Sequence, residues 1–164
     1  MTRMRRGTLW ISIVGVLAVT AYAALAAMQI LVWTPLAAVP GLTLDQIRGE
    51  LSDAGESMSV AMTIAILGIG VVLALVVAVV AVRARAHPVV PAMSLLSLLM
   101  LGGPGFFIAS FWPGMALADT FMISAGVTLA GVRPFYAVSA LAAAALVVGG
   151  VVAVLRARSA PAPA

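Results

Sequence analysis

The chain has 164 residues, of which 64% are hydrophobic and only 9% are charged. Soluble domains are usually about half apolar and a quarter charged, so this composition excludes an ordinary soluble domain and indicates a polytopic membrane protein. The absence of cysteine excludes disulfides, thiolate metal sites and cysteine nucleophiles. All nine basic residues are arginine, and with five acidic residues they give a net charge of +4. Lysine and asparagine, whose codons are rich in adenine, are both missing. Their absence is typical of a protein from a GC-rich bacterial genome.

The first apolar run covers residues 9–33 and follows a basic start with Arg3, Arg5 and Arg6. A helix of that length would measure about 37 Å, against a hydrocarbon core of roughly 30 Å. A cleaved secretory signal is the alternative, because Ala21-Tyr22-Ala23 resembles a cleavage site. The apolar run continues well past that point to Trp33, so we favour an uncleaved membrane helix.

Residues 34–59 form the one polar connection of any length. Pro35 and Pro40, at its start, are expected to end the first helix. Thr43 and Gln46 have the spacing of a capping box. Leu44, Ile47 and Leu51 then form one apolar stripe. The pattern predicts a short amphipathic helix lying on the membrane surface. A docking surface for a partner is the alternative interpretation.

Three further apolar runs predict membrane helices over residues 60–82, 89–111 and 136–155. The run at 89–111 contains the helix-breaking sequence Gly102-Gly103-Pro104-Gly105. We expect either a kink at Pro104, which membrane helices tolerate, or a break inside the membrane. Residues 112–135 are predicted to form an outer loop, although 115–132 could also be an interfacial helix, a re-entrant loop or a fifth crossing. We expect residues 1–158 to form a single bundle and 159–164 a disordered tail.

The distribution of arginine predicts the topology. With four crossings and a cytoplasmic N-terminus, seven arginines lie inside and only Arg48 and Arg133 lie outside, as the positive-inside rule requires. A fifth crossing reduces the bias to six against three and puts Asp119 inside the span, at a cost of roughly 2.5–3.5 kcal/mol. The prediction is therefore an all-α, four-helix bundle in the cell membrane with both termini cytoplasmic. Arginines scattered over helix ends bind lipid headgroups rather than nucleic acid.

The two halves of the chain echo each other weakly. Trp33-Thr34-Pro35 and Trp112-Pro113 close the two outward helices, while Val82-Arg83-Ala84-Arg85 and Leu155-Arg156-Ala157-Arg158 close the inward ones. A duplicated helical hairpin would explain this pattern. Independent selection of interfacial aromatics, terminal prolines and inner arginines would explain it equally well.

Chemistry-bearing residues are scarce. With a single histidine and no acid inside the four predicted spans, no nucleophile–base pair, carboxylate pair or metal site is indicated, so we expect neither enzymatic activity nor a cofactor. The polar residues inside the spans are neutral, and we expect them to form interhelical hydrogen bonds: Tyr22, Gln29, Thr63, Ser94, Ser97 and Ser139.

The function expected from these features is that of a structural or accessory subunit, which associates with itself or with another membrane protein. The alternative is an oligomeric conduit for ions or small solutes, in which a broken third helix lines a cavity near Asp119. Arg133 is a possible ion-pair partner of Asp119 across the outer loop. The candidate cavity or partner-contact residues are therefore Gly102, Gly103, Pro104, Gly105, Asp119 and Arg133.

Overall fold

The computed structural model describes residues 2–123 and 130–158, and in these ranges the chain is helical with no β-strand. The elements in chain order are α1 (Thr2–Met28), a π-helical turn η1 (Gln29–Trp33), α2 (Thr34–Ala38), α3 (Leu44–Asp53), α4 (Val60–Arg83), α5 (Val89–Met100), α6 (Gly102–Phe121), a 3₁₀ turn η2 (Ala130–Val132) and α7 (Arg133–Arg158). The expected tail at 159–164 lies outside the described residues.

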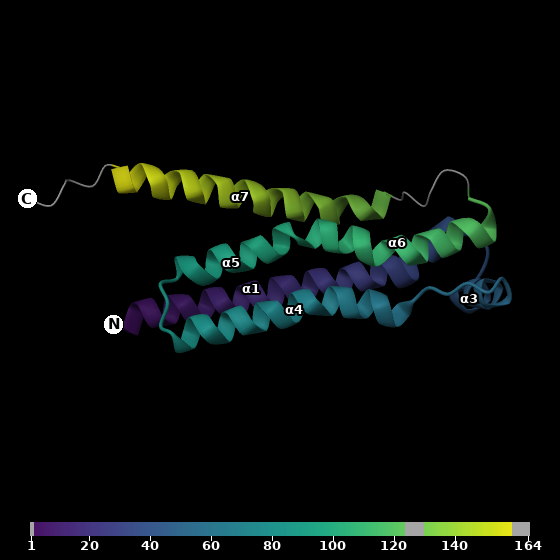
Figure 1. Cartoon of the computed structure of the whole chain (residues 1–164), viewed down its shortest axis with the longest axis horizontal. Helices are drawn as coiled ribbons and strands as arrows, with labels where there is room; N and C mark the ends of the chain where they lie inside the picture. Colours follow the sequence, from purple (N-terminus) through teal and green to yellow (C-terminus); the bar gives the residue numbers. More distant parts are fainter. Residues whose placement is uncertain (1, 124–129, 159–164) are drawn as a thin grey trace, which may run out of the picture.

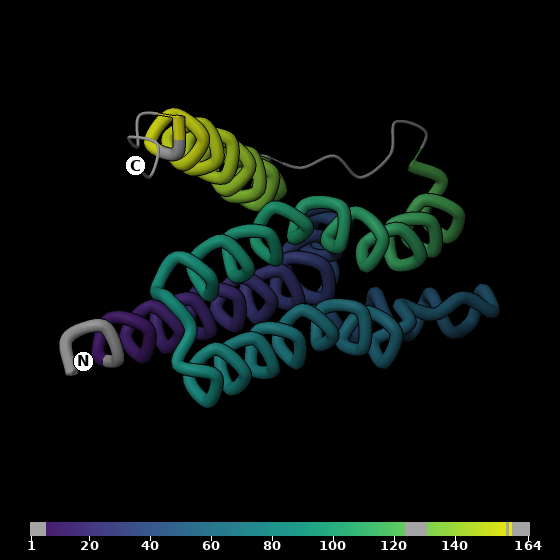
Figure 2. Tube along the Cα trace, turned by 60° about the vertical axis from the view of Figure 1, so that its left-hand side comes forward, coloured from purple at the N-terminus to yellow at the C-terminus, as the bar shows by residue number. Residues whose placement is uncertain are grey.

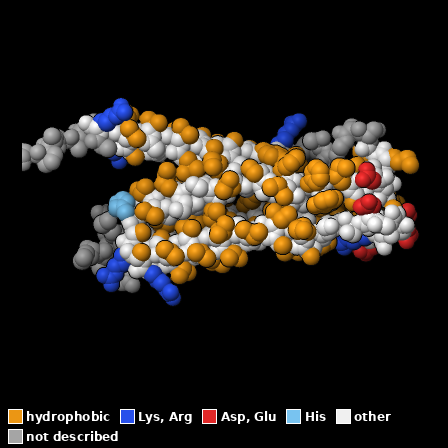
Figure 3. Space-filling view, in the orientation of Figure 1, with side chains coloured by type: hydrophobic (Ala, Val, Ile, Leu, Met, Phe, Trp, Pro, Cys, Tyr) orange, Lys and Arg blue, Asp and Glu red, His pale blue; other side chains and the backbone are white. Residues whose placement is uncertain are grey.

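Four helical stretches among the described residues are long and apolar enough to cross a bilayer: Arg6–Ala38, Val60–Arg83, Val89–Thr120 and Arg133–Arg156. This confirms the all-α class and the four candidate spans. The long helices run side by side, with the start of α1, the α4–α5 turn and the end of α7 at one end of the molecule and α3 at the other (Figure 1). Apolar side chains cover the length between the two ends (Figure 3).

The first long helix does not end at Pro35, as the sequence predicted, but continues through η1 and α2 to Ala38. Proline cannot donate the hydrogen bond of a regular helix, and its ring collides with the carbonyl four residues earlier. Here the turn before Pro35 widens, so that the Thr34 amide donates to the Gln29 carbonyl, five residues back. The wider turn lets the helix pass the proline, and the connection to α3 begins at Val39 rather than residue 34.

The amphipathic helix α3 forms as expected. Thr43 and Gln46 cap it reciprocally: the Thr43 amide donates to Gln46 Oε1 at 2.8 Å, and the Gln46 amide donates to Thr43 Oγ1 at 3.3 Å. Ile47 and Leu51 are fully buried in the main core cluster, which also contains Leu117 of α6. Ile47 and Leu51 of the predicted apolar stripe therefore pack against other parts of the same chain, whereas Leu44 stays half-buried.

The main core joins α1, η1, α4 and α6 around Ala26, Ile30, Leu67, Phe106 and Ala109, and it includes residues of α3 and α7 as well. α6 runs to Phe121, ten residues beyond the expected helix end at 111, so much of the predicted outer loop 112–135 is helical. Residues 124–129 of that loop are outside the described residues. α7 lies beside α5 and α6, on the opposite side of the bundle from α4 (Figures 1 and 2).

Candidate functional site

The third long helix is interrupted at Leu101, directly before Gly102-Gly103-Pro104-Gly105, where the sequence predicted a kink or break. α5 ends at Met100 and α6 begins at Gly102. Pro104 has no amide hydrogen to offer the Met100 carbonyl, and its ring pushes that carbonyl away. Leu101 nevertheless keeps right-handed helical angles, φ −73° and ψ −8°. The chain therefore bends at this point without leaving the helical conformation.

The hydroxyl of Ser139 on α7 forms hydrogen bonds to two backbone groups at the bend. Its Oγ accepts a hydrogen bond from the Gly103 amide at 2.7 Å and donates one to the Leu99 carbonyl at 2.9 Å. In a regular helix that amide and that carbonyl would bond to each other directly. Ser139 thus replaces a missing helical hydrogen bond with two bonds to a neighbouring helix, which satisfies both backbone groups in apolar surroundings.

The two glycines at the break lie in close contact with α1 and α7. A Cβ atom on Gly102 would lie 2.8 Å from Cζ of Tyr22, and one on Gly103 would lie 3.2 Å from the Cβ of Ser139. Gly105 has no such neighbour, since nothing lies within 4 Å of its Cβ position. Gly102 and Gly103 therefore let α6 approach its neighbours, whereas Gly105 does not serve that purpose.

Aromatic rings pack around the same point. Phe106 of α6 stacks on Phe135 of α7, with ring centroids 4.8 Å apart and an interplanar angle of 13°. Tyr22 of α1 meets Phe135 edge-on at 5.5 Å, and its hydroxyl donates to the Phe135 carbonyl at 3.4 Å. The break is consequently the place where α1, α6 and α7 are held together.

A cavity of about 210 Å³ lies next to the break, between α1, α4 and the α5–α6 junction. Gly102, Gly105 and Tyr22 line it together with aliphatic side chains such as Leu67 and Leu98. No acidic or basic side chain lines it. A cavity beside the broken helix was expected for a conduit, but this apolar lining suits a hydrocarbon group better than an ion.

A second proline in α6 is accommodated in a similar way. Pro113 has no amide hydrogen to donate to the Ala109 carbonyl, the acceptor four residues earlier. The hydroxyl of Thr63 on α4, which is buried, donates to that carbonyl at 3.2 Å. Thr63 thus serves the carbonyl that Pro113 leaves without a helical donor, whereas Ser139 bonds to the backbone groups of Leu99 and Gly103, next to Pro104.

Asp119 and Arg133 are not brought into this cluster. Asp119 lies near the exposed end of α6 and Arg133 begins α7, and both side chains are exposed. Among the described residues the one ion pair joins Arg48 to Asp45, so the suggested Asp119–Arg133 pair does not form. Pro104 is exposed too, and it acts on the backbone rather than through a contact.

Of the interior polar residues expected to bond between helices, Tyr22, Thr63 and Ser139 do so. Gln29 and Ser97 instead bond within their own stretch of chain, to Thr34 Oγ1 and to the Met93 carbonyl. The sequence marked Thr63 and Ser139 as hydrogen-bonding residues, but not as the partners of the backbone groups near Pro113 and Pro104. Their positions relative to Leu99 and Ala109 depend on how the helices pack.

The helix junction is a structural centre: its polar groups bond to one another, and its glycines and aromatic rings fit against neighbouring helices. In the part of the junction that the structure describes, no nucleophile lies beside a base and no two acidic side chains face each other. Comparisons of the chain with protein-family models, with curated protein sequences and with solved structures give no match. What the protein does is therefore argued from its own residues.

Proposed function

We propose that the protein is a non-enzymatic structural or accessory subunit of the bacterial cytoplasmic membrane, which binds a second copy of itself or another membrane protein. The exposure of α7 carries this proposal. Every side chain from Val151 to Arg156 is exposed, although the helix continues to Arg158. A helix held along its whole length by its own chain would show buried positions in each turn.

The composition of α7 supports close packing by another helix. Helices associate in lipid through small residues that let backbones approach, because no hydrophobic driving force exists between them. Gly149 is already used within the chain, since its Cβ position lies 3.5 Å from the Met93 sulfur, whereas nothing lies within 4 Å of that of Gly150. Gly150 and the exposed valines after it leave room for a partner helix.

The arrangement of charges supports a topology with both termini in the cytoplasm. Arg83 is the last residue of α4, Arg85 follows two residues later, and Arg156 lies near the end of α7, at the same end of the molecule as the start of α1 (Figures 1 and 3). The acidic residues of α3 lie at the opposite end (Figure 3). Such a segregation of arginine is what the positive-inside rule associates with the cytoplasmic side.

The packing at the helix junction favours an accessory role over a conduit. Phe106 and Phe135 are buried and stacked where α1, α6 and α7 meet. The backbone groups of Leu99 and Gly103, which a broken helix would offer to an ion, are occupied by Ser139. A path for ions needs polar groups that are open to the passing solute.

Cysteine crosslinking in membranes tests the proposal, because the natural chain has no thiol. A photoreactive maleimide on Val151→Cys should give a crosslinked dimer or a crosslink to another membrane protein. Val80→Cys is the matched control, since Val80 is an exposed valine of α4 that lies toward the same end of the molecule as Val151. Equal crosslinking from both positions, or none from Val151→Cys, would overturn an interface on α7.

A further inference from the structure

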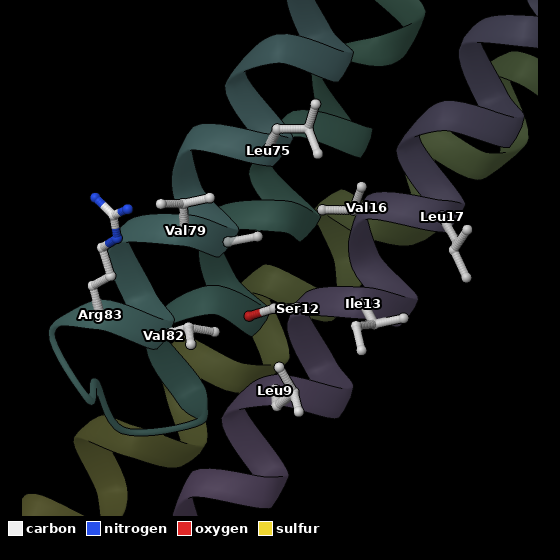
Figure 4. A pocket seen from close by; sticks show the side chains of 10 residues that line it. Leu9, Ser12, Ile13, Val16, Leu17, Leu75, Val79, Val82 and Arg83 are labelled. Atoms are coloured by element: carbon white, nitrogen blue, oxygen red, sulfur yellow. The ribbon is translucent and has the colours of Figure 1, made fainter.

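A groove of about 480 Å³ runs along the outside of the bundle between α1 and α4. Leu9, Ile13 and Leu17 of α1 and Leu75 and Val79 of α4 supply much of its apolar wall (Figure 4). It differs from the exposed strip of α7 in having walls from two helices and in holding two polar side chains, Ser12 and Arg83. Those two residues indicate what could occupy it.

The groove has the length of an acyl chain in one leaflet. Its lining extends over nine residues on each helix, from Leu9 to Leu17 and from Arg83 back to Leu75, and the eight steps between the first and last residue measure about 12 Å at the helical rise. One leaflet contributes roughly 15 Å of hydrocarbon. The groove therefore covers most of the depth of the leaflet on the side where α1 begins and α4 ends.

Arg83 places an uncompensated positive charge at one end of this groove. Its side chain is exposed and extends beside Val79 along α4 (Figure 4). The five acids of the chain belong to other parts of it: Asp45, Glu50, Asp53, Glu56 and Asp119. The one ion pair among the described residues involves Arg48. A phosphate group is a chemically suitable partner for this guanidinium.

Ser12 adds a buried hydroxyl without a partner. The residue is 2% exposed, and its Oγ forms no hydrogen bond in the described structure. It points from α1 into the space between α1 and α4, close to Val82, the neighbour of Arg83 (Figure 4). A serine hydroxyl can rotate about χ1 to reach an acceptor. The ester carbonyl of a phospholipid is such an acceptor, and it lies just below the phosphate.

We infer that the groove is a binding site for an anionic phospholipid of the cytoplasmic leaflet. One acyl chain lies between α1 and α4, the phosphate pairs with Arg83, and an ester carbonyl accepts from Ser12. The inference rests on the membrane insertion and topology proposed above, but not on association through α7. A negatively charged lipid is favoured over a zwitterionic one because the groove offers a cation and no acid.

Native mass spectrometry of the full-length protein, delipidated in detergent, tests this site. The protein is titrated with phosphatidylglycerol and with phosphatidylcholine of the same acyl chains. We expect tighter binding of phosphatidylglycerol, weakened roughly tenfold by Arg83→Gln and also weakened by Ala78→Phe, which fills the groove. Arg156→Gln is the control, because it removes the same charge at the same end of the molecule from a helix that does not line the groove.

Equal affinity for the two lipids would overturn the inference, and so would equal losses in Arg83→Gln and Arg156→Gln, since both results indicate general attraction by positive charge. A polypeptide that crosslinks to Val79→Cys in membranes and excludes lipid would also overturn it, in favour of a helix as the occupant. Unchanged helical circular dichroism and a single species in size-exclusion chromatography identify variants that remain folded. Crosslinking through Val151→Cys is independent of these outcomes, so the two proposals fail separately.

Discussion

The hydroxyl of Ser139 lies 2.7 Å from the amide nitrogen of Gly103 and accepts its hydrogen bond. The two residues are 36 positions apart in the chain, yet the hydroxyl takes the place of the helical acceptor that the bend at Leu101 removes. This relationship ties α7 to the α5–α6 junction, and the stability of the bundle should depend on it.

Ser139→Ala should lower the free energy of unfolding in detergent by about 1–2 kcal/mol, because the Gly103 amide and the Leu99 carbonyl lose their partner in apolar surroundings. Thermal or denaturant unfolding followed by circular dichroism measures the change. Ser110→Ala is the control, since the Ser110 hydroxyl bonds only to Phe107 of its own helix. If the two variants unfold alike, Ser139 does not have the role assigned to it.

Gly102→Ala should destabilise the protein by about 1–3 kcal/mol, because the added methyl group would lie 2.8 Å from the Tyr22 ring. Gly105→Ala is the matched control three residues later, where nothing lies within 4 Å. There alanine should be neutral or stabilise by up to about 1 kcal/mol through its higher helix propensity. The same unfolding assay compares them, and a destabilised Gly105→Ala with an unaffected Gly102→Ala would contradict the packing described.

Thr63→Val should cost about 1 kcal/mol, because the Ala109 carbonyl loses the hydroxyl that replaces the missing Pro113 amide. In a Pro113→Ala background the helix regains an amide donor for that carbonyl, so Thr63→Val should cost less there. A double-mutant cycle in unfolding free energy measures this coupling. Additive effects of the two substitutions would mean that Thr63 and Pro113 act independently.

Single cysteines should label from opposite sides of the membrane if the proposed topology is correct. Glu50→Cys and Arg133→Cys should react with an impermeant maleimide added outside intact cells, since both lie toward the outer end in that topology. His87→Cys, in the exposed turn between α4 and α5, should react only from the cytoplasmic side of inverted vesicles. Labelling of Arg133→Cys from the cytoplasmic side alone would require a fifth crossing.

The region from Pro35 to Leu51 shows where reasoning from sequence was sufficient and where it failed. The capping box at Thr43 and Gln46 and the stripe of Ile47 and Leu51 were predicted correctly, because both are set by residues within one or two turns. The surface that covers the stripe was not predicted, since it belongs to Leu117 and other residues far along the chain. Pro35 was taken as a helix end because local rules do not anticipate the π-helical turn before it.

The class of this protein was predictable from the sequence: it has too few charges for a soluble surface, four apolar segments of membrane-spanning length, and helix-breaking residues beside Pro104. These properties follow from composition and from steric effects within a few residues. The packing of the helices was needed to show that Ser139 and Thr63 bond to the carbonyls of Leu99 and Ala109, that Gly102 lies close to the Tyr22 ring, and that Asp119 and Arg133 stay apart. Such contacts depend on the rotation and depth of each helix against its neighbours, and these are set by the packing of all of them together.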